Sequence, residues 1–320
     1  MRLSTSTNIA AFLPDAGQKN GFSFCIELCA KAGYKYLDLN LCEAMNPNSR
    51  LRGDEWESYV KETAELGRRW GVEFTQSHLP YYDIFASNAA DKVKLMEELI
   101  RRCIIASGEL GVKWAVTHPG TLYSAGPDTS KSLEKNVEYY STHLECAKKA
   151  GVGIALENDF EYRSPPYQRI YAADVSALCE LVDAFKSSSM GVCYDFGHAN
   201  LCGGFHRENL RIIGSRLKAT HVQDNHFLHD DHLLPFFGRT NWAEAMAGLA
   251  EIGYNGDLTY EVQEFARYMP NELKHLAVEL SIKIGNYLLE LYEATCNKGT
   301  VNEGIVNKGI VNEGSHRGTE

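Results

Sequence analysis

Apolar residues along the chain follow two alternating patterns. Short β-branched or aromatic runs, typical of buried strands, are each followed by a longer stretch with apolar residues at the spacing of an amphipathic helix. The predicted strands are residues 2–8, 36–41, 72–78, 113–118, 153–158, 190–195, 217–222 and 257–262. The predicted helices are residues 22–33, 54–70, 90–110, 130–150, 172–187, 206–215, 241–252 and 271–292. Strict alternation of strand and helix predicts parallel strands joined by right-handed crossovers.

Glycines mark the ends of the predicted helices. The helical pattern stops at a glycine before the next strand, as expected for a residue that adopts a positive φ just after a helix. These glycines are Gly33, Gly67, Gly71, Gly111, Gly151 and Gly253. An open doubly wound sheet is the competing fold, but no strand leads into a GxGxxG or GxxxxGK[ST] loop. Eight strand–helix pairs are the number that closes a barrel, so we expect an α/β protein with a (β/α)8 TIM barrel over residues 1–292.

The segment after Tyr292 has a different composition. Residues 297–314 form a short-period repeat of Val-Asn-(Glu or Lys)-Gly units. Such a segment has too few apolar groups to offset the entropy lost on ordering it. We therefore predict that residues 293–320 form a low-complexity, flexible C-terminal tail with weak strand propensity at its Ile-Val pairs.

Composition narrows the class of protein further. Hydrophobic residues make up 44% and charged residues 23% of the 320 residues, which is ordinary globular composition. No apolar run approaches the ~18–20 residues of a membrane helix, and residues 1–9 lack the apolar core of a signal peptide. The net charge of −10 argues against a broad nucleic-acid-binding surface. We expect neither a membrane nor a nucleic-acid partner.

The nine cysteines indicate a reducing compartment. They are odd in number and irregularly spaced, no CxxC pair occurs, and some, such as Cys146, sit inside apolar helical patterns. We interpret them as reduced core residues of a cytoplasmic protein.

Residues that can bind a metal or move a proton recur at the ends of successive predicted strands. They are His78, His118, Glu157, Asp195, His221 and Glu261. The carboxyl ends of parallel barrel strands converge on one face, so these side chains are expected to point into a single bowl. Three carboxylates packed together without a cation would repel one another. The set Glu157, Asp195, His221 and Glu261 therefore predicts a site for one divalent ion, Mn²⁺, Mg²⁺, Co²⁺ or Zn²⁺.

A second polar group lies close to the first in sequence. His198 follows Asp195 by three residues, and Asp230 and His232 form an Asp-x-His pair on the loop after the seventh predicted strand. We take these three as candidate substrate-binding residues, whereas His226 and His229 on the same loop are ordinary solvated histidines. Arg239 is a candidate phosphate ligand, with a solvated surface arginine as the alternative.

Four motifs together resemble a known family. They are LEN (156–158), YDFGHAN (194–200), HVQDN (221–225) and DHLLPFFG (231–238). In this order and spacing they resemble the xylose isomerase-like TIM-barrel superfamily of sugar phosphate isomerases/epimerases and endonuclease IV-type AP endonucleases, over about residues 1–292. Phe236 stands where that family usually has glycine.

The resemblance to the ketose 3-epimerase and hydroxypyruvate isomerase-like members implies roles for these residues. One divalent metal would be held by the positions that match Glu157, Asp195, His221 and Glu261. The two glutamates would be the acid/base pair, with His198 on substrate oxygens and with His78 and His118 as substrate-orienting donors. The implied function is a metal-dependent isomerase or epimerase of carbohydrate metabolism. It would act on a sugar, a sugar phosphate or a small hydroxy-ketone through a metal-stabilised enediolate.

The same resemblance leaves alternatives open. Endonuclease IV-type enzymes hold three zinc ions with nine ligands, and the matching positions are His78, His118, Glu157, Asp195, His198, His221, Asp230, His232 and Glu261. The acidic charge and the sequence after Asn158 depart from the nuclease pattern. A metal-dependent sugar lyase or dehydratase, and a non-catalytic metal- or sugar-binding barrel, are further alternatives. Barrels of this superfamily commonly pair, which implies a homo-oligomer.

Overall fold

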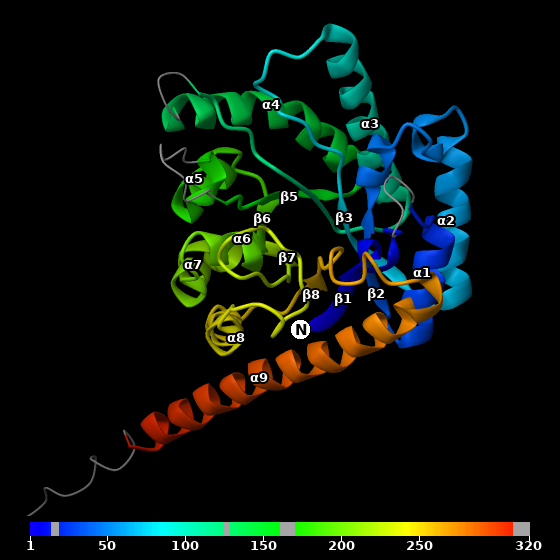
Figure 1. Ribbon diagram of the computed structural model, residues 1–320. Coiled ribbons are helices and arrows are strands. Elements are labelled where there is room, and N and C mark those ends of the chain that lie inside the picture. The colour runs from blue at the N-terminus through cyan, green and yellow to red at the C-terminus, as the bar shows by residue number, and fades with distance from the viewer. Residues whose placement is uncertain (14–18, 124–127, 161–169, 310–320) are drawn as a thin grey trace, which may run out of the picture.

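Parallel strands form the centre of the molecule. The computed structural model describes residues 1–13, 19–123, 128–160 and 170–309 (Figure 1). Within them the strands are β1 Arg2–Ser6, β2 Tyr36–Asn40, β3 Glu73–His78, β4 Trp114–Thr117, β5 Gly153–Glu157, β6 Met190–Asp195, β7 Leu217–His221 and β8 Asp257–Tyr260. They form one sheet in the order β7-β6-β5-β4-β3-β2-β1-β8, with every pair parallel. A parallel bridge between Val222 and Tyr260 joins its two ends. The predicted (β/α)8 TIM barrel is confirmed.

Helices surround the strands (Figure 1). The α-helices are α1 Phe22–Ala32, α2 Trp56–Trp70, α3 Ala90–Glu109, α4 Thr129–Ala150, α5 Val175–Ala184, α6 Phe196–Leu201, α7 His206–Ile213, α8 Trp242–Glu251 and α9 Lys274–Gly309. Short 3₁₀ turns are η1 Thr7–Ala10, η2 Leu41–Met45, η3 Arg50–Arg52, η4 Tyr171–Ala173, η5 Gly214–Arg216 and η6 Asn271–Leu273. The sequence pattern does not predict α6, which begins directly after β6 because Oδ1 of Asp195 accepts a hydrogen bond from the His198 N–H (2.6 Å).

Five of the predicted helix-end glycines have positive φ, as a left-handed C-terminal residue requires. They are Gly33, Gly71, Gly111, Gly151 and Gly253. The prediction was wrong for Gly67, which lies inside α2. A Cβ atom there would lie 2.9 Å from the ring of Phe74, so this glycine lets α2 approach β3 closely.

The sheet contains two register irregularities that affect the barrel interior. The pairing of β2 with β3 shifts between Leu37 and Asp38, and the pairing of β6 with β7 shifts between Val192 and Cys193. An extra residue in one strand re-aims the side chains that follow it. After the first shift Asp38 pairs with Gln76, and both side chains are buried inside the protein.

The last helix is longer than the sequence pattern predicts. The pattern ends this helix at residue 292, whereas α9 continues to Gly309 and extends beyond the barrel (Figure 1). Its first half is anchored by buried residues such as Val278 and Leu288. Continuing an existing helix needs no new nucleus, which is the physical reason for the extension. Residues 310–320 lie outside the described part, and a separate flexible tail over 293–320 stays a prediction.

Within the described residues, no helix combines the length and the apolar composition needed to cross a bilayer. All nine cysteines lie in the described part, and none of them forms a disulfide bond.

Candidate active site

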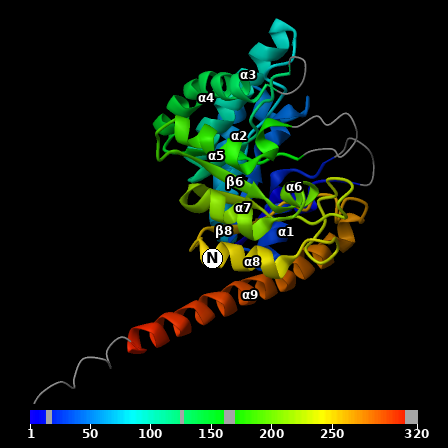
Figure 2. The ribbon, with the colours of Figure 1, turned by 90° about the vertical axis from the view of Figure 1, so that its left-hand side faces the viewer.

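The carboxyl ends of the strands open into a cavity of about 770 Å³. In Figure 2 the loop after β7 and the segment after β8 lie at the same end of the barrel as α6. His78, His118, His198 and Glu261 line this cavity, and Glu157 lies fully buried. The strand ends that the sequence singles out therefore converge on one face.

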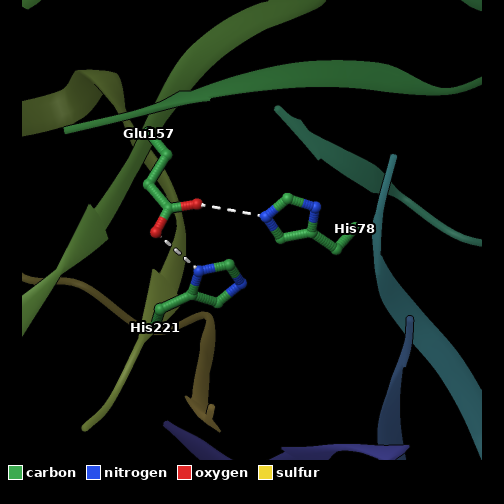
Figure 3. A group of neighbouring side chains, drawn as sticks. All are labelled: His78, Glu157 and His221. Atoms are coloured by element: carbon green, nitrogen blue, oxygen red, sulfur yellow. Dashed lines mark hydrogen bonds and ion pairs between the residues drawn. The ribbon is translucent and has the colours of Figure 1, made fainter. Parts of the chain in front are cut away.

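Glu157, the last residue of β5, lies at the centre of the group. Its Oε1 lies 2.9 Å from Nδ1 of His221, and its Oε2 lies 3.5 Å from Nε2 of His78 (Figure 3). Nε2 of His118 is 3.6 Å from the same Oε2. Burial opposes ionisation of this carboxyl, but the imidazoles of His221 and His118 outweigh it and hold the pKa of Glu157 well below its ordinary value. Glu157 is therefore a carboxylate with imidazole nitrogens near both oxygens, although Oε2 has no hydrogen-bond partner among the described residues.

The predicted set of four donors is brought together. Glu157, Asp195, His221 and Glu261 each offer one ligand atom, and these atoms all lie within 4.8 Å of one another. Adjacent strands hold Asp195 and His221 at the same level, because the two residues are register partners. Oε2 of Glu261 lies 3.4 Å from Nδ1 of His221.

The electrostatics of this set fit a bound cation. Oδ2 of Asp195 is buried and has no hydrogen-bond partner among the described residues. Burial, together with the carboxylates of Glu157 and Asp230, raises the pKa of Asp195 to about 7, although His198 offsets part of this rise. A divalent ion would compensate the crowded negative charge, and three oxygens with one imidazole are donors that Mn²⁺, Mg²⁺, Co²⁺ and Zn²⁺ accept. The residues therefore fit a divalent metal, and their ligand roles stay a prediction.

A further donor group lies on α6 and the loop after β7. His198, Asp230 and His232 also offer ligand atoms within 4.8 Å of one another. Nε2 of His232 lies 2.8 Å from Oδ2 of Asp230, and Nδ1 lies 2.9 Å from the carbonyl oxygen of Glu261. Since both acceptors lack protons, both ring nitrogens of His232 donate. Burial disfavours this imidazolium, yet the Asp230 carboxylate raises the pKa of His232 to about 9.

Gln223, which the sequence reasoning missed, connects the two donor groups. Its Nε2 donates to Oδ1 of Asp230 (2.6 Å) and lies 3.3 Å from Oδ1 of Asp195. A Cβ atom on Gly197 would lie 2.0 Å from the Gln223 amide, so glycine is required where α6 passes this side chain. Gln223 sits in the HVQDN motif, but its contacts depend on tertiary packing that the motif does not encode.

His78 and His118 form a pair on the other side of Glu157. Their Nε2 atoms lie 3.2 Å apart, and both rings contact the ring of Tyr81. Burial lowers the pKa of His118, although the nearby Glu157 carboxylate offsets part of this effect. Sγ of Cys42 lies 3.2 Å from Nδ1 of His78. Sequence reasoning missed Cys42 because the predicted strand before it, residues 36–41, does not end in a charged residue.

Arg239, a predicted substrate-binding residue, does not line the cavity. Its side chain is exposed, and its guanidinium lies 5.8 Å from the centre of the Phe227 ring. Among the described residues that line the cavity, Lys19 is the only lysine or arginine. His226 and His229 are exposed on the loop after β7, in agreement with their interpretation as solvated residues.

Comparisons with known proteins agree with the fold. The family model described as "Xylose isomerase-like TIM barrel" matches residues 26–278. An uncharacterized protein of Methanocaldococcus jannaschii is 30% identical over 241 residues, which cover 71% of this chain and 80% of that protein. A probable endonuclease 4 of Geobacillus sp. is 28% identical over 166 residues, or 48% of this chain and 53% of that protein.

Solved structures of sugar epimerases are also similar. A D-tagatose 3-epimerase-like protein superposes with a TM-score of 0.70 and 23% identity, covering 93% of this chain and 99% of that chain. A D-psicose 3-epimerase in the presence of D-fructose gives a TM-score of 0.68 and 15% identity, covering 90% and 99%. At these identities the likeness shows the fold.

Proposed function

Because the chain belongs to the xylose isomerase-like TIM barrel family, we propose that it is a divalent-metal-dependent isomerase or epimerase that acts on a sugar or a small hydroxy-ketone. The observation that carries the proposal is the pair of carboxylates, Glu157 and Glu261, that share a donor group with Asp195 and His221. The sugar 3-epimerases with the same fold support this choice of substrate class.

In this proposal the two glutamates are the proton-transfer groups. They come from β5 and from the residue after β8, so they approach the donor group from different sides of the barrel. Glu261 reaches the cavity, and Glu157 lies beneath it. In this proposal one carboxylate removes the proton from the carbon beside the substrate carbonyl, and the other returns a proton at the other face or at the neighbouring carbon. The four donors would hold a divalent ion, which would supply Lewis acidity to polarise the carbonyl.

The histidines that line the cavity orient the substrate in this proposal. His78 and His118 present their Nε2 atoms beside Glu157, where they reach oxygens of a polyhydroxy chain. His198 is held by its Nδ1, 2.8 Å from the carbonyl oxygen of Asn158, so that its Nε2 is directed toward Asp230. Asp230 and His232 also line the cavity. Hydroxyl groups both donate and accept, so this mixture of carboxylates and imidazoles suits a sugar.

Deuterium exchange tests the proposed reaction without knowledge of the physiological substrate. The protein loaded with Mn²⁺ is incubated in D₂O with D-fructose, D-tagatose, D-psicose or L-ribulose, and deuterium is followed by NMR. Deuterium at carbon 3 identifies a 3-epimerase, and deuterium at carbon 1 identifies an isomerase. Failure of a metal-loaded protein to exchange any proton beside the carbonyl across this panel would contradict the proposal. The control is the Glu261→Gln variant, which lacks one carboxylate of the proposed acid/base pair and should lose the exchange.

The proposal includes properties beyond the reaction. We propose that the chain binds one divalent ion, that the protein is cytoplasmic with reduced cysteines, and that it forms a homo-oligomer. Elemental analysis gives the metal and its stoichiometry, and light scattering of the purified protein gives the mass of the assembly. A monomeric mass near 35.8 kDa would contradict the oligomer.

One observation favours a second candidate, a three-zinc phosphodiesterase that acts on abasic DNA. The group His198, Asp230 and His232, and the group His78, Glu157 and His221, each bring three donors within 4.8 Å, in addition to the four-donor set. The similarity to a probable endonuclease 4 supports this alternative. Two observations oppose it. The net charge is −10, and Lys19 is the only lysine or arginine among the described residues that line the cavity. The described cavity lining therefore offers little positive charge to bind the phosphates of DNA.

The His118→Ala variant separates the two candidates. As a substrate-orienting residue, His118 contributes to turnover, and its removal leaves the metal content unchanged. As a zinc ligand, its removal lowers the metal content by about one ion per chain, measured by mass spectrometry. Incision of abasic DNA by the wild type, with about three zinc ions bound, would establish the nuclease and overturn the isomerase.

A further inference from the structure

Asp38 is a buried carboxylate behind His221 that the proposed reaction leaves unused. It lies on β2, and its side chain has no exposed surface. Nε2 of Gln76 donates to Oδ2 of Asp38 (2.9 Å) and to the carbonyl oxygen of Thr220 (3.3 Å), which fixes the carboxyl group in place. Oδ1 of Asp38 has no hydrogen-bond partner among the described residues.

The imidazole of His221 is the group that can compensate this carboxylate. Its Nε2 lies 3.8 Å from Oδ2 of Asp38, and this nitrogen also lacks a hydrogen-bond partner in the described part of the chain. Among the described residues, no lysine or arginine forms an ion pair with Asp38. A carboxylate in the interior is costly unless hydrogen bonds or an opposite charge compensate it. A movement of about 0.8 Å would bring Nε2 to hydrogen-bond distance.

The two nitrogens of His221 face different partners. Nδ1 lies 2.9 Å from Oε1 of Glu157 and 3.4 Å from Oε2 of Glu261, so it is the atom that belongs to the donor group. A neutral imidazole has one N–H and one lone pair. If Nδ1 offers its lone pair to a cation, the proton must be on Nε2, and this N–H is directed toward Asp38. The partner of the second nitrogen thus decides which tautomer is stable.

We propose that Asp38 is a positioning residue that holds His221 in the Nε2–H tautomer and thereby keeps Nδ1 available as a metal ligand. The inference rests on the proposed function, since it takes the four-donor set to bind a divalent ion. Gln76 completes the arrangement because its amide holds Oδ2 of Asp38 on the His221 side. The β2–β3 register shift places Asp38 and Gln76 side by side.

The Asp38→Asn variant tests the proposal by changing the partner at Nε2. The amide oxygen can take the place of Oδ2 and keep the bond from Gln76, but it carries no charge, so it holds the Nε2–H of His221 more weakly than the carboxylate does. We expect Zn²⁺ affinity, measured by chelator competition, to fall about 10- to 100-fold. The matched control is Thr259→Val, a buried residue of β8 whose hydroxyl has no hydrogen-bond partner among the described residues. This control should bind Zn²⁺ with the wild-type affinity.

The tautomer itself is measured by ¹⁵N NMR of the chain labelled at histidine, with His221→Asn to assign the signal. The Zn²⁺-loaded wild type should show His221 protonated at Nε2. This measurement needs no Asp38 variant, so it can refute the proposal even if Asp38→Asn fails to fold. Protonation at Nδ1 in the loaded wild type, or unchanged Zn²⁺ affinity in folded Asp38→Asn, would overturn the inference.

The outcomes also separate this inference from the proposed function. If the wild type and the Asp38→Asn variant bind Zn²⁺ with equal affinity, only the proposed role of Asp38 is refuted. A folded wild type that binds neither Zn²⁺ nor Mn²⁺ removes the metal-dependent reaction together with this inference.

Discussion

Asp224 anchors the loop that carries the second donor group, and its replacement gives a sharp stability prediction. Its buried carboxylate accepts four hydrogen bonds. Oδ1 accepts from the backbone N–H groups of Asn225 (2.9 Å) and Thr240 (3.0 Å). Oδ2 accepts from the N–H of Phe236 and from Nε1 of Trp242, both at 3.0 Å. These contacts join the two ends of the loop on which Asp230 and His232 lie.

The size of the effect follows from these contacts. In Asp224→Asn one side-chain oxygen becomes an NH₂ group, which cannot accept, so two N–H donors lose their partner and face another donor. A hydrogen bond to a charged group contributes about 1.5–3 kcal/mol, and losing two of them costs about 3–6 kcal/mol of unfolding free energy. Because whole proteins are stable by only about 5–15 kcal/mol, this single atom change is a large fraction of the total.

Urea unfolding followed by circular dichroism measures the predicted loss. The midpoint should fall while the dependence of the free energy on urea stays the same, because the folded state keeps its shape. Asp231→Asn is the control on the same loop. Oδ2 of Asp231 accepts one backbone N–H, from His226, at 3.2 Å, and we expect a change within about 0.5 kcal/mol. A loss below about 1 kcal/mol in Asp224→Asn would refute the reasoning about its four donors.

The remaining predictions concern catalysis, metal, pH and the C-terminus. Glu157→Gln should lower turnover at least about 100-fold while much of the metal binding persists, and wild-type activity would remove Glu157 from the acid/base role. Asp195→Ala should lose the bound metal, and unchanged metal content in elemental analysis would contradict its ligand role. Burial lowers the pKa of His206 to about 4, so the unfolded state takes up a proton first as the pH falls from about 6.5. The wild type should lose about 3 kcal/mol more stability than His206→Gln between pH 7 and pH 4, and equal acid dependence of the two proteins in urea unfolding would rule this out. Deletion of residues 297–320 should leave activity and melting temperature unchanged, since buried contacts such as Leu288 precede the deletion; a large drop in melting temperature would show that these residues support the barrel.

The sequence predicted the barrel and the converging strand ends because both depend on local periodicity. A strand that is buried on both faces and ends in one polar residue is visible in the sequence, and parallel topology then brings those ends together. The register partners Asp195 and His221 illustrate this, since each is the last residue of its strand.

The parts that the sequence did not predict depend on contacts across the barrel. Asp38 lies in the middle of a strand, and its position beside Gln76 follows from a register shift that leaves no periodic signal. Gln223 lies in a recognised motif, but its bonds to Asp195 and Asp230 require α6 and the loop after β7 to be in place. For Asp38 the available signal was its acidic side chain inside the predicted strand 36–41, because burying a carboxylate for a structural role alone is costly.

The shared donors explain why one set of residues supports two candidate reactions. Glu157 and His221 belong both to the four-donor set and to the group that includes His78. If one ion occupies the four-donor set, the imidazoles of His78, His118 and His198 remain free to bind substrate oxygens. If three ions are bound, the same imidazoles are ligands, and none of them is left to orient a sugar. The two functions therefore exclude each other at these three histidines, and the number of ions per chain determines which chemistry the cavity performs.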